Sequence, residues 1–255
     1  MRPLISPELR HEIDEKLAAA NEYFDSKRRA GIALYGWDPS CECVDCGDTG
    51  IKPETNRACW CEVGRGIAEQ KELGDAWMNL VPVHHRTSRL ATHPNQNARE
   101  IGYQWLRVDY PANRGMLLAG DTGTGKTGLA VAVAYELHMQ GVPVRFWTTV
   151  DMLDHLRPGD NHSPDLLMDQ LKGTGLLVID DLGLQKETEW TVERMTEIVD
   201  GRQRRGVPTI ITTNLNSKEF KAQVGDRVWS RCFETMTIHN LQGPDIRKQR
   251  LAGVA

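Results

Sequence analysis

Short apolar runs and longer one-sided segments alternate along the second half of the chain. Unbroken apolar runs predict strands that are buried on both faces, and apolar residues three or four apart predict helices with one buried face. The predicted strands span 116–119, 142–147, 176–179, 207–213 and 234–238. The predicted helices span 129–140, 150–156, 165–172, 191–205 and 245–251, with two short ones between 217 and 231. This alternation predicts an α/β fold in which crossover helices flank a parallel sheet.

The first part of the chain is patterned differently. A helix is predicted for residues 6–30, because apolar residues recur there at helical spacing: Leu9, Ile13, Leu17, Ala20 and Phe24. This helix either lies on its own domain or docks a partner protein. Further helices are predicted for 64–80 and 98–108, with a linker or loop at 83–95.

Charge and composition limit which partners the chain can bind and in which compartment it is expected. The chain has 31 basic and 35 acidic residues and a net charge of -4, so any contact with nucleic acid must be a local patch. No apolar stretch approaches the ~20 residues that a membrane span needs. Because the first sixteen positions are rich in charge, we find no apolar core of a signal peptide. We therefore expect a chain in the reducing bacterial cytoplasm, encoded by a cell or a phage, with no membrane partner.

The segment GDTGTGKT fits the pattern G-x-x-x-x-G-K-[ST] and lies between a predicted strand and a predicted helix. Glycines in this pattern let backbone N–H groups turn toward phosphate oxygens, and the helix N-terminus adds partial positive charge. Lys126 adds a full charge, and the Thr127 hydroxyl can bind Mg²⁺. The alternative is a glycine-rich turn with a chance lysine. We predict a phosphate-binding loop made by Gly120, Asp121, Thr122, Gly123, Thr124, Gly125, Lys126 and Thr127.

Five of the six cysteines crowd together: Cys41, Cys43, Cys46, Cys59 and Cys61. In a reducing compartment they are thiols or metal ligands rather than disulfides. Cys43-x-x-Cys46 and Cys59-x-Cys61 form two pairs that can close a tetrahedral thiolate site for Zn²⁺. The alternative is a cluster of free or redox-active thiols.

Other residues bear on this cluster. Cys41 is a spare candidate ligand, and His84 or His85 could substitute for a cysteine. Trp60 lies between two of the cysteines and either packs on the metal or faces a partner, of which we expect packing. Cys232 stands alone downstream, and we expect it to be packed rather than reactive.

A second motif, LLVIDD at 176–181, is a buried strand that ends in two carboxylates. At the carboxyl edge of a parallel sheet they would lie beside the phosphate-binding loop. Asp180 would then hold Mg²⁺, and Asp181 would orient the attacking water or accept its proton. A solvated turn is the alternative for such a pair.

Two further motifs follow. Asn214 ends the next strand and can hydrogen-bond a terminal phosphate and the water, although a polar turn explains it equally well. Arg227, Arg231 and Arg247 come later. Isolated arginines are usually surface residues, but one placed after this strand can reach a nucleotide in a neighbouring subunit, where it contributes about 10³–10⁵ to the rate in well-studied phosphoryl-transfer enzymes.

These motifs together carry a resemblance to a known family. The segments are AGDTGTGKTGLA (119–130), LLVIDDLG (176–183), PTIITTNLNSKEF (208–220), GDRVWSRCFE (225–234) and GPDIRKQR (243–250). They resemble the DnaC/DnaI/IstB branch of the AAA+ ATPases, which contains replicative helicase loaders and transposition ATPases, over roughly residues 80–251. The cysteine segment CVDCGDTG (43–50) is similar to the N-terminal zinc-binding domain of the loaders, which docks the helicase and which IstB-type proteins generally lack.

The resemblance implies roles for individual residues. It makes Asp180 and Asp181 the acidic pair, Asn214 the first sensor, Arg231 the arginine finger that acts in a neighbouring subunit, and Arg247 the second sensor. Arg227 is a weaker alternative for the finger. Two departures stand out. Gly128 occupies the place where the branch usually has His, and Asp181 the place where most AAA+ proteins have Glu, which suggests slow, switch-like hydrolysis.

We therefore expect an AAA+ P-loop ATPase domain with a small helical and zinc-binding N-terminal domain. The expected division is residues 1–36 as N-terminal helix, 37–75 as cysteine-rich docking module, 76–113 as linker and helix, and 114–255 as ATPase domain. The expected function is ATP-dependent loading of a hexameric, DnaB-type replicative helicase onto single-stranded DNA, with ATP, Mg²⁺ and Zn²⁺ as cofactors and self-association through the arginine finger.

Three alternatives remain. An IstB/TnsC-like regulator of DNA transposition would bind duplex DNA and recruit a transposase. A small-molecule kinase would need an arginine-rich lid and an acceptor pocket, which the sequence does not offer. An adaptor would bind nucleotide without hydrolysing it. For single-stranded DNA, weak candidate contacts are Arg202, Arg204 and Arg205, for which a solvated helix end is the favoured interpretation.

Overall fold

The computed structural model describes Cys43, Cys46, residues 49–53, 55–159, 163–183, Gln185 and residues 188–251. The helix predicted for 6–30 and the candidate ligand Cys41 lie outside these residues. The described part of the chain forms two compact units. One holds the described residues up to Ala76 together with Met139–Gly141, and the other holds Trp77–His138 and the residues from Val142 onward.

The smaller unit contains a two-stranded antiparallel ladder. Strand β1 (Ile51–Lys52) pairs with β2 (Arg57–Ala58), with Ile51 opposite Ala58. Helix α2 (Glu62–Leu80) begins directly after this hairpin. The ladder is too short to hold a unit together by its own packing, so the cysteines around it must be considered as a source of stability.

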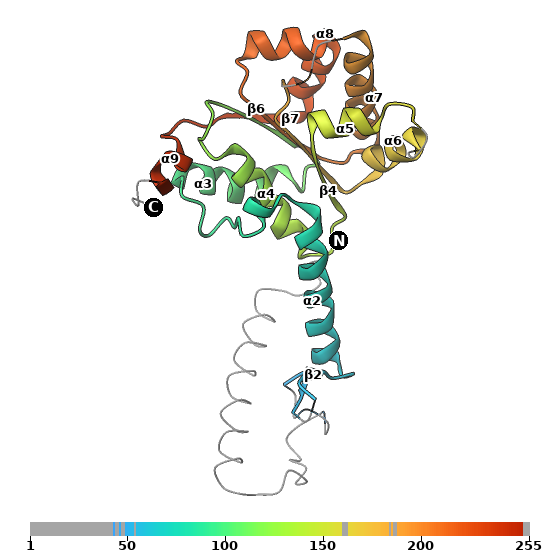
Figure 1. Ribbon diagram of the computed structural model, residues 1–255, viewed down its shortest axis with the longest axis vertical. Coiled ribbons are helices and arrows are strands. Elements are labelled where there is room, and N and C mark those ends of the chain that lie inside the picture. The colour runs from blue at the N-terminus through green and yellow to red at the C-terminus, as the bar shows by residue number, and fades with distance from the viewer. Residues whose placement is uncertain are drawn as a thin grey trace, which may run out of the picture. The chain divides into compact units, whose positions relative to one another are not determined.

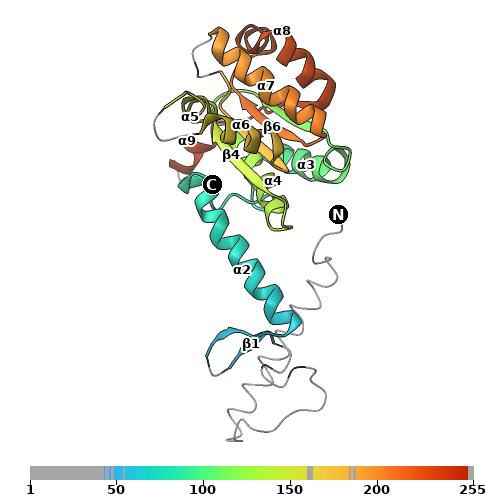
Figure 2. The same cartoon turned by 90° about the vertical axis from the view of Figure 1, so that its right-hand side faces the viewer.

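The larger unit is built on a five-stranded sheet in which all strands are parallel (Figures 1 and 2). Its strand order is β4-β5-β6-β3-β7. The strands are β3 (Gly115–Ala119), β4 (Val144–Thr148), β5 (Leu176–Asp180), β6 (Thr209–Thr213) and β7 (Met236–Asn240). This topology confirms the predicted α/β fold with a parallel sheet.

Crossover helices connect the strands of this sheet. They are α4 (Lys126–His138), α5 (Thr149–His155), α6 (Pro164–Gly173), α7 (Glu189–Arg205) and α8 (Ser217–Thr235). Helix α3 (Gln96–Gln104) precedes β3, and α9 (Ile246–Leu251) follows β7. The predicted loop 83–95 holds a 3-10 turn, η1 (Val83–His85), and α3 continues into a π-helical turn, η2 (Trp105–Asp109). None of the helices in the described ranges is long and apolar enough to cross a membrane.

Most boundaries lie within three residues of the sequence prediction, and the region of α8 and β7 shows how one of them moves. The two short helices expected between 217 and 231 are present as the halves of α8, which breaks at Gly225, where φ is 82° and ψ is 161°. The second half continues to Thr235, so β7 begins at Met236 rather than at 234. Glu234 therefore belongs to the helix, where its carboxylate meets Arg231 one turn earlier.

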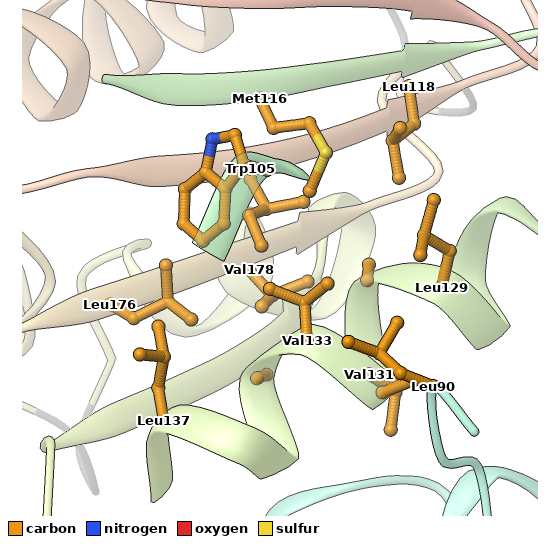
Figure 3. Packing of buried hydrophobic residues seen from close by; sticks show 14 of the residues in the cluster. Leu90, Trp105, Met116, Leu118, Leu129, Val131, Val133, Leu137, Leu176 and Val178 are labelled. Carbon is orange, nitrogen blue, oxygen red and sulfur yellow. The ribbon is translucent and has the colours of Figure 1, made fainter. Parts of the chain in front are cut away.

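Alternating side chains of the strands feed two separate cores. Met116, Leu118, Leu176 and Val178 point to the face covered by α4, whose residues Leu129 to Ala134 are all buried (Figure 3). Strand residues of the opposite parity pack against α6, α7 and α8: Leu117, Leu177, Ile179 and Ile211. Because both faces are covered, as Figure 1 shows for α4 on one side and α7 and α8 on the other, the interior strands β3 and β5 carry continuous apolar runs, as the sequence predicts.

Candidate functional site

The loop between β3 and α4 requires glycine at specific positions. Gly120 has φ of 139°, and a Cβ added there would lie 2.3 Å from the carbonyl oxygen of Leu241. Gly125 has φ of 96°, and its Cβ would meet Ile246 and His93 at 2.8 and 2.9 Å. A side chain at either position would be strained in its backbone and would collide with its neighbours. The loop therefore keeps the curled conformation in which backbone N–H groups can face an anion.

Lys126 begins α4 and folds back over this loop. Its Nζ donates hydrogen bonds of 2.8 Å to the carbonyl oxygens of Gly120 and Asp121, and the residue is only 5% exposed. Burial lowers the pKa of Lys126, while the carboxylates of Asp181 and Asp180 act in the opposite direction. The loop thus encloses a cation that only hydrogen-bond acceptors or an anion can satisfy.

The P-loop threonine is joined to the acidic end of β5. The Thr127 hydroxyl donates to Asp180 Oδ1 at 2.9 Å, and the Thr212 hydroxyl on β6 donates to the same oxygen at 2.6 Å. The backbone N–H of Asp181 donates to Thr212 Oγ1 at 2.9 Å. Burial raises the pKa of Asp180, and the hydrogen bonds from Thr212 and Thr127 lower it. Thr212 thus ties the two carboxylates to the neighbouring strand, a role that sequence reasoning did not assign to it.

One cavity of about 240 Å³ collects most of the residues predicted for the nucleotide site. Those that line it are Thr122, Gly123, Gly125, Lys126, Thr127, Asp181, Asn214 and Arg247. Arg247 reaches it because α9 begins against the loop, where the N–H of Ile246 donates to the carbonyl oxygen of Gly123 at 2.9 Å. Asp180 lies next to the cavity through its bond to Thr127, and Thr124 closes the loop by donating to the carbonyl of Asp121. Asp181 has φ of 54°, an uncommon value for a residue other than glycine, and such conformations occur often at functional sites.

The linker that precedes α3, residues 83–95, also lines this cavity. The sequence did not reveal this contribution. His84, His85, Arg89 and His93 all line it. His93 is 5% exposed, its Nε2 donates to the carbonyl oxygen of Gly125 at 3.2 Å, and its Nδ1 accepts from the N–H of Asn95. The two histidines considered as zinc ligands, His84 and His85, thus belong to the nucleotide-type cavity, with their rings in edge contact.

His93 also explains Gly128. A Cβ at position 128 would lie 3.3 Å from His93 Nε2 and 3.6 Å from its Cδ2. The space in which a side chain at 128 would begin is therefore occupied by an imidazole from the linker. An imidazole from the linker thus lies beside position 128, where the resemblance leads one to expect a histidine.

Arg231, the predicted finger, is not among the residues that line this cavity. It lies on the second half of α8 and pairs with Asp200 of α7 and with Glu234. Arg227, the alternative finger, pairs with the same Asp200. Both arginines are therefore kept apart from the nucleotide-type cavity of their own chain, as a residue that acts on a neighbouring subunit would be.

Arg202 is a correction to the sequence analysis. Both interpretations given there, a contact to single-stranded DNA and a solvated helix end, are wrong for this residue, because it is 1% exposed. Its guanidinium donates to the carbonyl oxygens of Leu171, Thr174 and Pro208 and to the Thr209 hydroxyl. It joins α7 to the loops around β5 and β6. Arg204 and Arg205 are exposed, as expected of a helix end.

The four predicted zinc ligands converge. The ligand sulfurs of Cys43, Cys46, Cys59 and Cys61 all lie within 4.8 Å of one another. Cys43 and Cys59 sulfurs are 3.6 Å apart, as are those of Cys46 and Cys61. A tetrahedron with Zn–S bonds of about 2.3 Å has edges of roughly 3.8 Å, so the donor set fits Zn²⁺. Burial raises the pKa of the Cys46 thiol, so its thiolate form needs a cation close by.

Two neighbouring expectations have opposite outcomes. Trp60 is 84% exposed, so the expectation that it packs on the metal is wrong, and its ring faces outward between two cysteines. Cys232 is fully buried in the core between the sheet and α8, as predicted for a packed thiol. Burial raises the pKa of Cys232 to about 12, which keeps it a thiol.

The geometry of the cavity agrees with comparisons to known proteins. A family described as IstB-like ATP binding protein matches residues 103–244, which cover more than half of the chain and include the phosphate-binding loop, the acidic pair and Asn214. The chain belongs to the IstB-like ATP-binding protein family.

Relatives of this IstB-like protein include a replication protein. The replicative helicase loader DnaC of Escherichia coli K12 is 30% identical over 158 residues, which cover 59% of this chain and 64% of the loader. The chain thus spans just under two thirds of the length of this curated relative. Among solved structures, DnaC helicase loader matches with a TM-score of 0.56 and 24% identity, covering 63% of this chain and all of that one. DnaI matches with a TM-score of 0.57 and 19% identity, covering 67% and 99%.

These findings confirm the predicted branch of the AAA+ fold and make the protein a member of a nucleotide-binding family. ATP is therefore the expected occupant of the cavity, and Mg²⁺ its usual companion. The residues fit this occupant: the curled loop and the cation of Lys126 line the cavity, and a hydroxyl and a carboxylate, Thr127 and Asp180, offer the oxygen atoms that Mg²⁺ prefers.

Proposed function

We propose that this IstB-like protein is an ATP-dependent loader that places a hexameric replicative helicase of the DnaB type onto single-stranded DNA when replication begins. The observation that carries the proposal is the combination, in one chain, of a nucleotide cavity with a four-cysteine cluster resembling the helicase-docking module of loaders. The similarity to the replicative helicase loader DnaC supports it. We assign docking to residues 37–75 together with the helix predicted in 1–36, a linker to 76–113 and ATP turnover to 114–255.

The cavity supports the following division of labour. The loop from Gly120 to Thr127 and the charge of Lys126 bind the phosphates, and Thr127 with Asp180 holds Mg²⁺, which supplies charge neutralisation at the phosphates. Asp181 orients the attacking water and accepts its proton. Asn214 contacts the terminal phosphate, and Arg247 contacts the nucleotide of its own subunit.

A second subunit completes the site. Arg231 of one protomer reaches the terminal phosphate held by the next, which couples assembly to the presence of ATP. The shorter side chain of Asp181, compared with a glutamate, suits slow hydrolysis that acts as a switch. Phosphate release measured for the wild type and for Asp181→Asn tests this role. Equal rates would remove Asp181 from catalysis and leave an adaptor that only binds nucleotide.

The decisive experiment is co-purification with the DnaB-type helicase of the host. We expect a stable complex with the full chain, and its loss both when the first 75 residues are removed and when Cys46→Ser and Cys59→Ser are combined in the full chain. Lys126→Ala is the matched control, because it alters the nucleotide cavity and leaves the docking unit intact. A complex that survives both changes to the docking unit would contradict the assignment.

The alternative function is regulation of DNA transposition. It is favoured by one observation, that the matching family is the IstB-like one. Such a regulator would bind duplex DNA in an ATP-dependent way without any helicase. Tight binding to duplex DNA together with no helicase complex would therefore replace the loader proposal by this one.

A further inference from the structure

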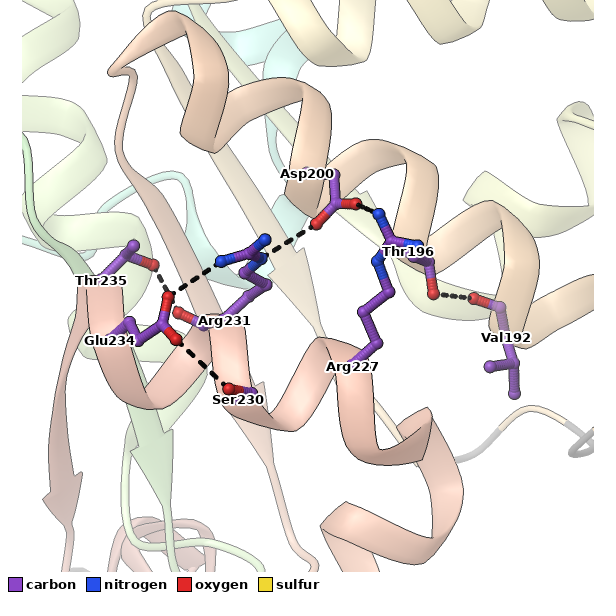
Figure 4. A network of polar contacts seen from close by, with 8 residues as sticks. All are labelled: Val192, Thr196, Asp200, Arg227, Ser230, Arg231, Glu234 and Thr235. Carbon is purple, nitrogen blue, oxygen red and sulfur yellow. Dashed lines mark hydrogen bonds and ion pairs between the residues drawn. The ribbon is translucent and has the colours of Figure 1, made fainter.

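Two arginines of α8 share one buried carboxylate on α7. The Asp200 side chain is 9% exposed, and each of its oxygens takes one arginine (Figure 4). Arg227 Nη2 is 2.5 Å from Oδ2, and Arg231 Nε is 3.3 Å from Oδ1. Asp200 therefore connects both candidate fingers to the packed helix pair α7 and α8.

Arg231 has a second anchor one turn further along its own helix. Its Nη1 donates to Glu234 Oε2 at 3.0 Å, and Ser230 donates to the other oxygen of Glu234 at 3.3 Å. Among the described residues, these contacts hold Nε and Nη1 of Arg231, and no contact is seen at its Nη2. The side chain is 37% exposed. The guanidinium is thus held at two of its three nitrogens, and the third, Nη2, is left open.

The two arginines differ in what they can give up. A buried carboxylate that loses all its cationic partners is strongly unfavourable. Arg227 makes the shorter contact with Asp200 and can neutralise it alone. Asp200 therefore keeps a cationic partner when Arg231 binds an anion outside its own chain. Arg227 is therefore suited to remain with Asp200, and Arg231 to interact with a partner.

We propose that Asp200 is a positioning residue for the arginine finger. It holds Arg231 by Nε so that the open Nη2 of the guanidinium meets the terminal phosphate bound in the neighbouring protomer, and Arg227 serves as the counter-cation of Asp200 rather than as a second finger. This inference rests on the proposed function of Arg231 in a neighbouring site. An arginine held in advance loses less side-chain freedom when it binds, since its planar fork is already oriented.

Assemblies mixed from two variants separate the protomer that supplies Arg231, the donor, from the protomer that supplies the nucleotide cavity, the receiver. Lys126→Ala protomers bind nucleotide poorly but still offer Arg231, whereas Arg231→Ala protomers keep the cavity but lack the finger. Neither is expected to hydrolyse ATP well alone, and their mixture is expected to recover activity. The readout is phosphate release per Arg231→Ala protomer as donor protomers are added.

Asp200 is then changed on one side of the mixture at a time. With Asp200→Asn added to the Lys126→Ala donor, we expect at least a tenfold loss of the recovered rate. With Asp200→Asn added to the Arg231→Ala receiver, we expect a rate within about twofold of the unmodified mixture. A merely structural role would lower both equally. Asp200→Glu in the donor, which keeps the charge on a longer arm, should restore part of the rate, and Arg227→Ala in the donor should stay within about threefold.

The outcomes are distinguishable. If donors with Asp200→Asn recover the same rate as unmodified donors, or a higher one, Asp200 does not position Arg231. The role of Arg231 as the finger is unaffected by that result. Receivers with Arg231→Ala that hydrolyse ATP alone at the wild-type rate overturn the proposed function of the finger. Thermal melting of each protomer identifies variants that do not fold, and for those the Asp200→Glu donor decides.

Discussion

The hydroxyl of Thr127 donates a hydrogen bond of 2.9 Å to Oδ1 of Asp180, across the gap between the phosphate-binding loop and the end of β5. The two residues are far apart in sequence, and the parallel pairing of β3 with β6, and of β6 with β5, brings them together. A hydroxyl and a carboxylate oxygen at this distance are a ready pair of oxygen ligands for one hard cation. The contact therefore marks where Mg²⁺ would enter the site.

The first prediction concerns this pair. Asp180→Asn keeps the shape of the side chain and removes its charge, so the gain in nucleotide affinity that Mg²⁺ provides should fall by about tenfold or more, equivalent to about 1.4 kcal/mol. Binding of ATP without Mg²⁺ should change much less, since Lys126 and the loop are untouched. Fluorescent-nucleotide titrations with Mg²⁺ and with a chelator measure both. Asp169→Asn, an exposed acid on α6, is the control, and an equal loss in that variant would contradict the assignment.

The second prediction concerns the cysteine cluster. The protein as purified should hold one Zn²⁺ per chain, and Cys46→Ser with Cys59→Ser should hold none, because two of four thiolates cannot close the tetrahedron. Metal analysis measures the content. Cys232→Ser should keep its zinc, since that thiol lies in the other unit and in a closed core. A thiol-alkylating reagent should modify the cluster only after chelation, and rapid modification of all four cysteines without chelator would favour free thiols.

The third prediction concerns the buried Arg202. Arg202→Ala should lower the free energy of unfolding by about 3 kcal/mol or more, since each buried carbonyl left without a donor costs about 1–3 kcal/mol. Chemical denaturation measures this. The matched control is Arg204→Ala, an exposed residue on the same helix end, for which we expect a change within about 0.5 kcal/mol. If Arg204→Ala destabilises the protein as much as Arg202→Ala, the buried hydrogen bonds of Arg202 do not account for its effect on stability.

The sequence predicted those parts of the site whose chemistry depends on neighbours along the chain. The loop from Gly120 to Thr127 encodes its own backbone conformation through glycine, and the run before Asp180 shows a strand buried on both faces. Parallel pairing then forces their ends to the same sheet edge. The four-cysteine cluster was predicted for the same reason, because spacing limits which thiols can meet around one ion.

Other features depend on the path of the chain through space, and no local pattern contains them. Arg202 and Arg204 look alike in sequence, and only the rotation of α7 against the sheet decides that one is buried and the other exposed. The sharing of Asp200 by Arg227 and Arg231 needs α7 and α8 to pack side by side. His93 belongs to a linker without periodicity, so its position against the phosphate-binding loop was not predictable.

The fourth prediction concerns the contact between His93 and Gly128. Alanine is favoured over glycine by about 0.8–1.0 kcal/mol in a helix interior and by less in the first turn, where Gly128 lies. A Cβ at 128 would also press on His93 Nε2 at 3.3 Å. Gly128→Ala should therefore stabilise the protein less in the wild type than it does when His93→Ala is present. A double-mutant cycle of unfolding free energies measures the coupling between the two substitutions. Additive effects of Gly128→Ala and His93→Ala would contradict the prediction. The His93→Ala change alone should also weaken nucleotide binding severalfold, because it releases the linker from Gly125.

The fifth prediction concerns His239 on β7 and the dependence of stability on pH. Burial lowers the pKa of His239 below its usual 6.5, against the opposing effect of Asp109, and its Nε2 has no hydrogen-bond partner among the described residues. The folded protein thus keeps this imidazole neutral at a pH where the unfolded chain already takes up a proton. Its stability contribution is present above pH 6.5 and is lost as the pH falls below that value.

We expect His239→Gln, which cannot titrate, to reduce this loss. The melting temperature should fall less steeply in the variant than in the wild type between about pH 6.5 and pH 5, where one proton contributes at most about 1.4 kcal/mol per pH unit. At about pH 8 the imidazole is neutral in both folded and unfolded chains, so the difference measured there is the cost of the substitution itself. Parallel curves for the two proteins across the acid range would show that another group, and not His239, sets the acid sensitivity of the fold.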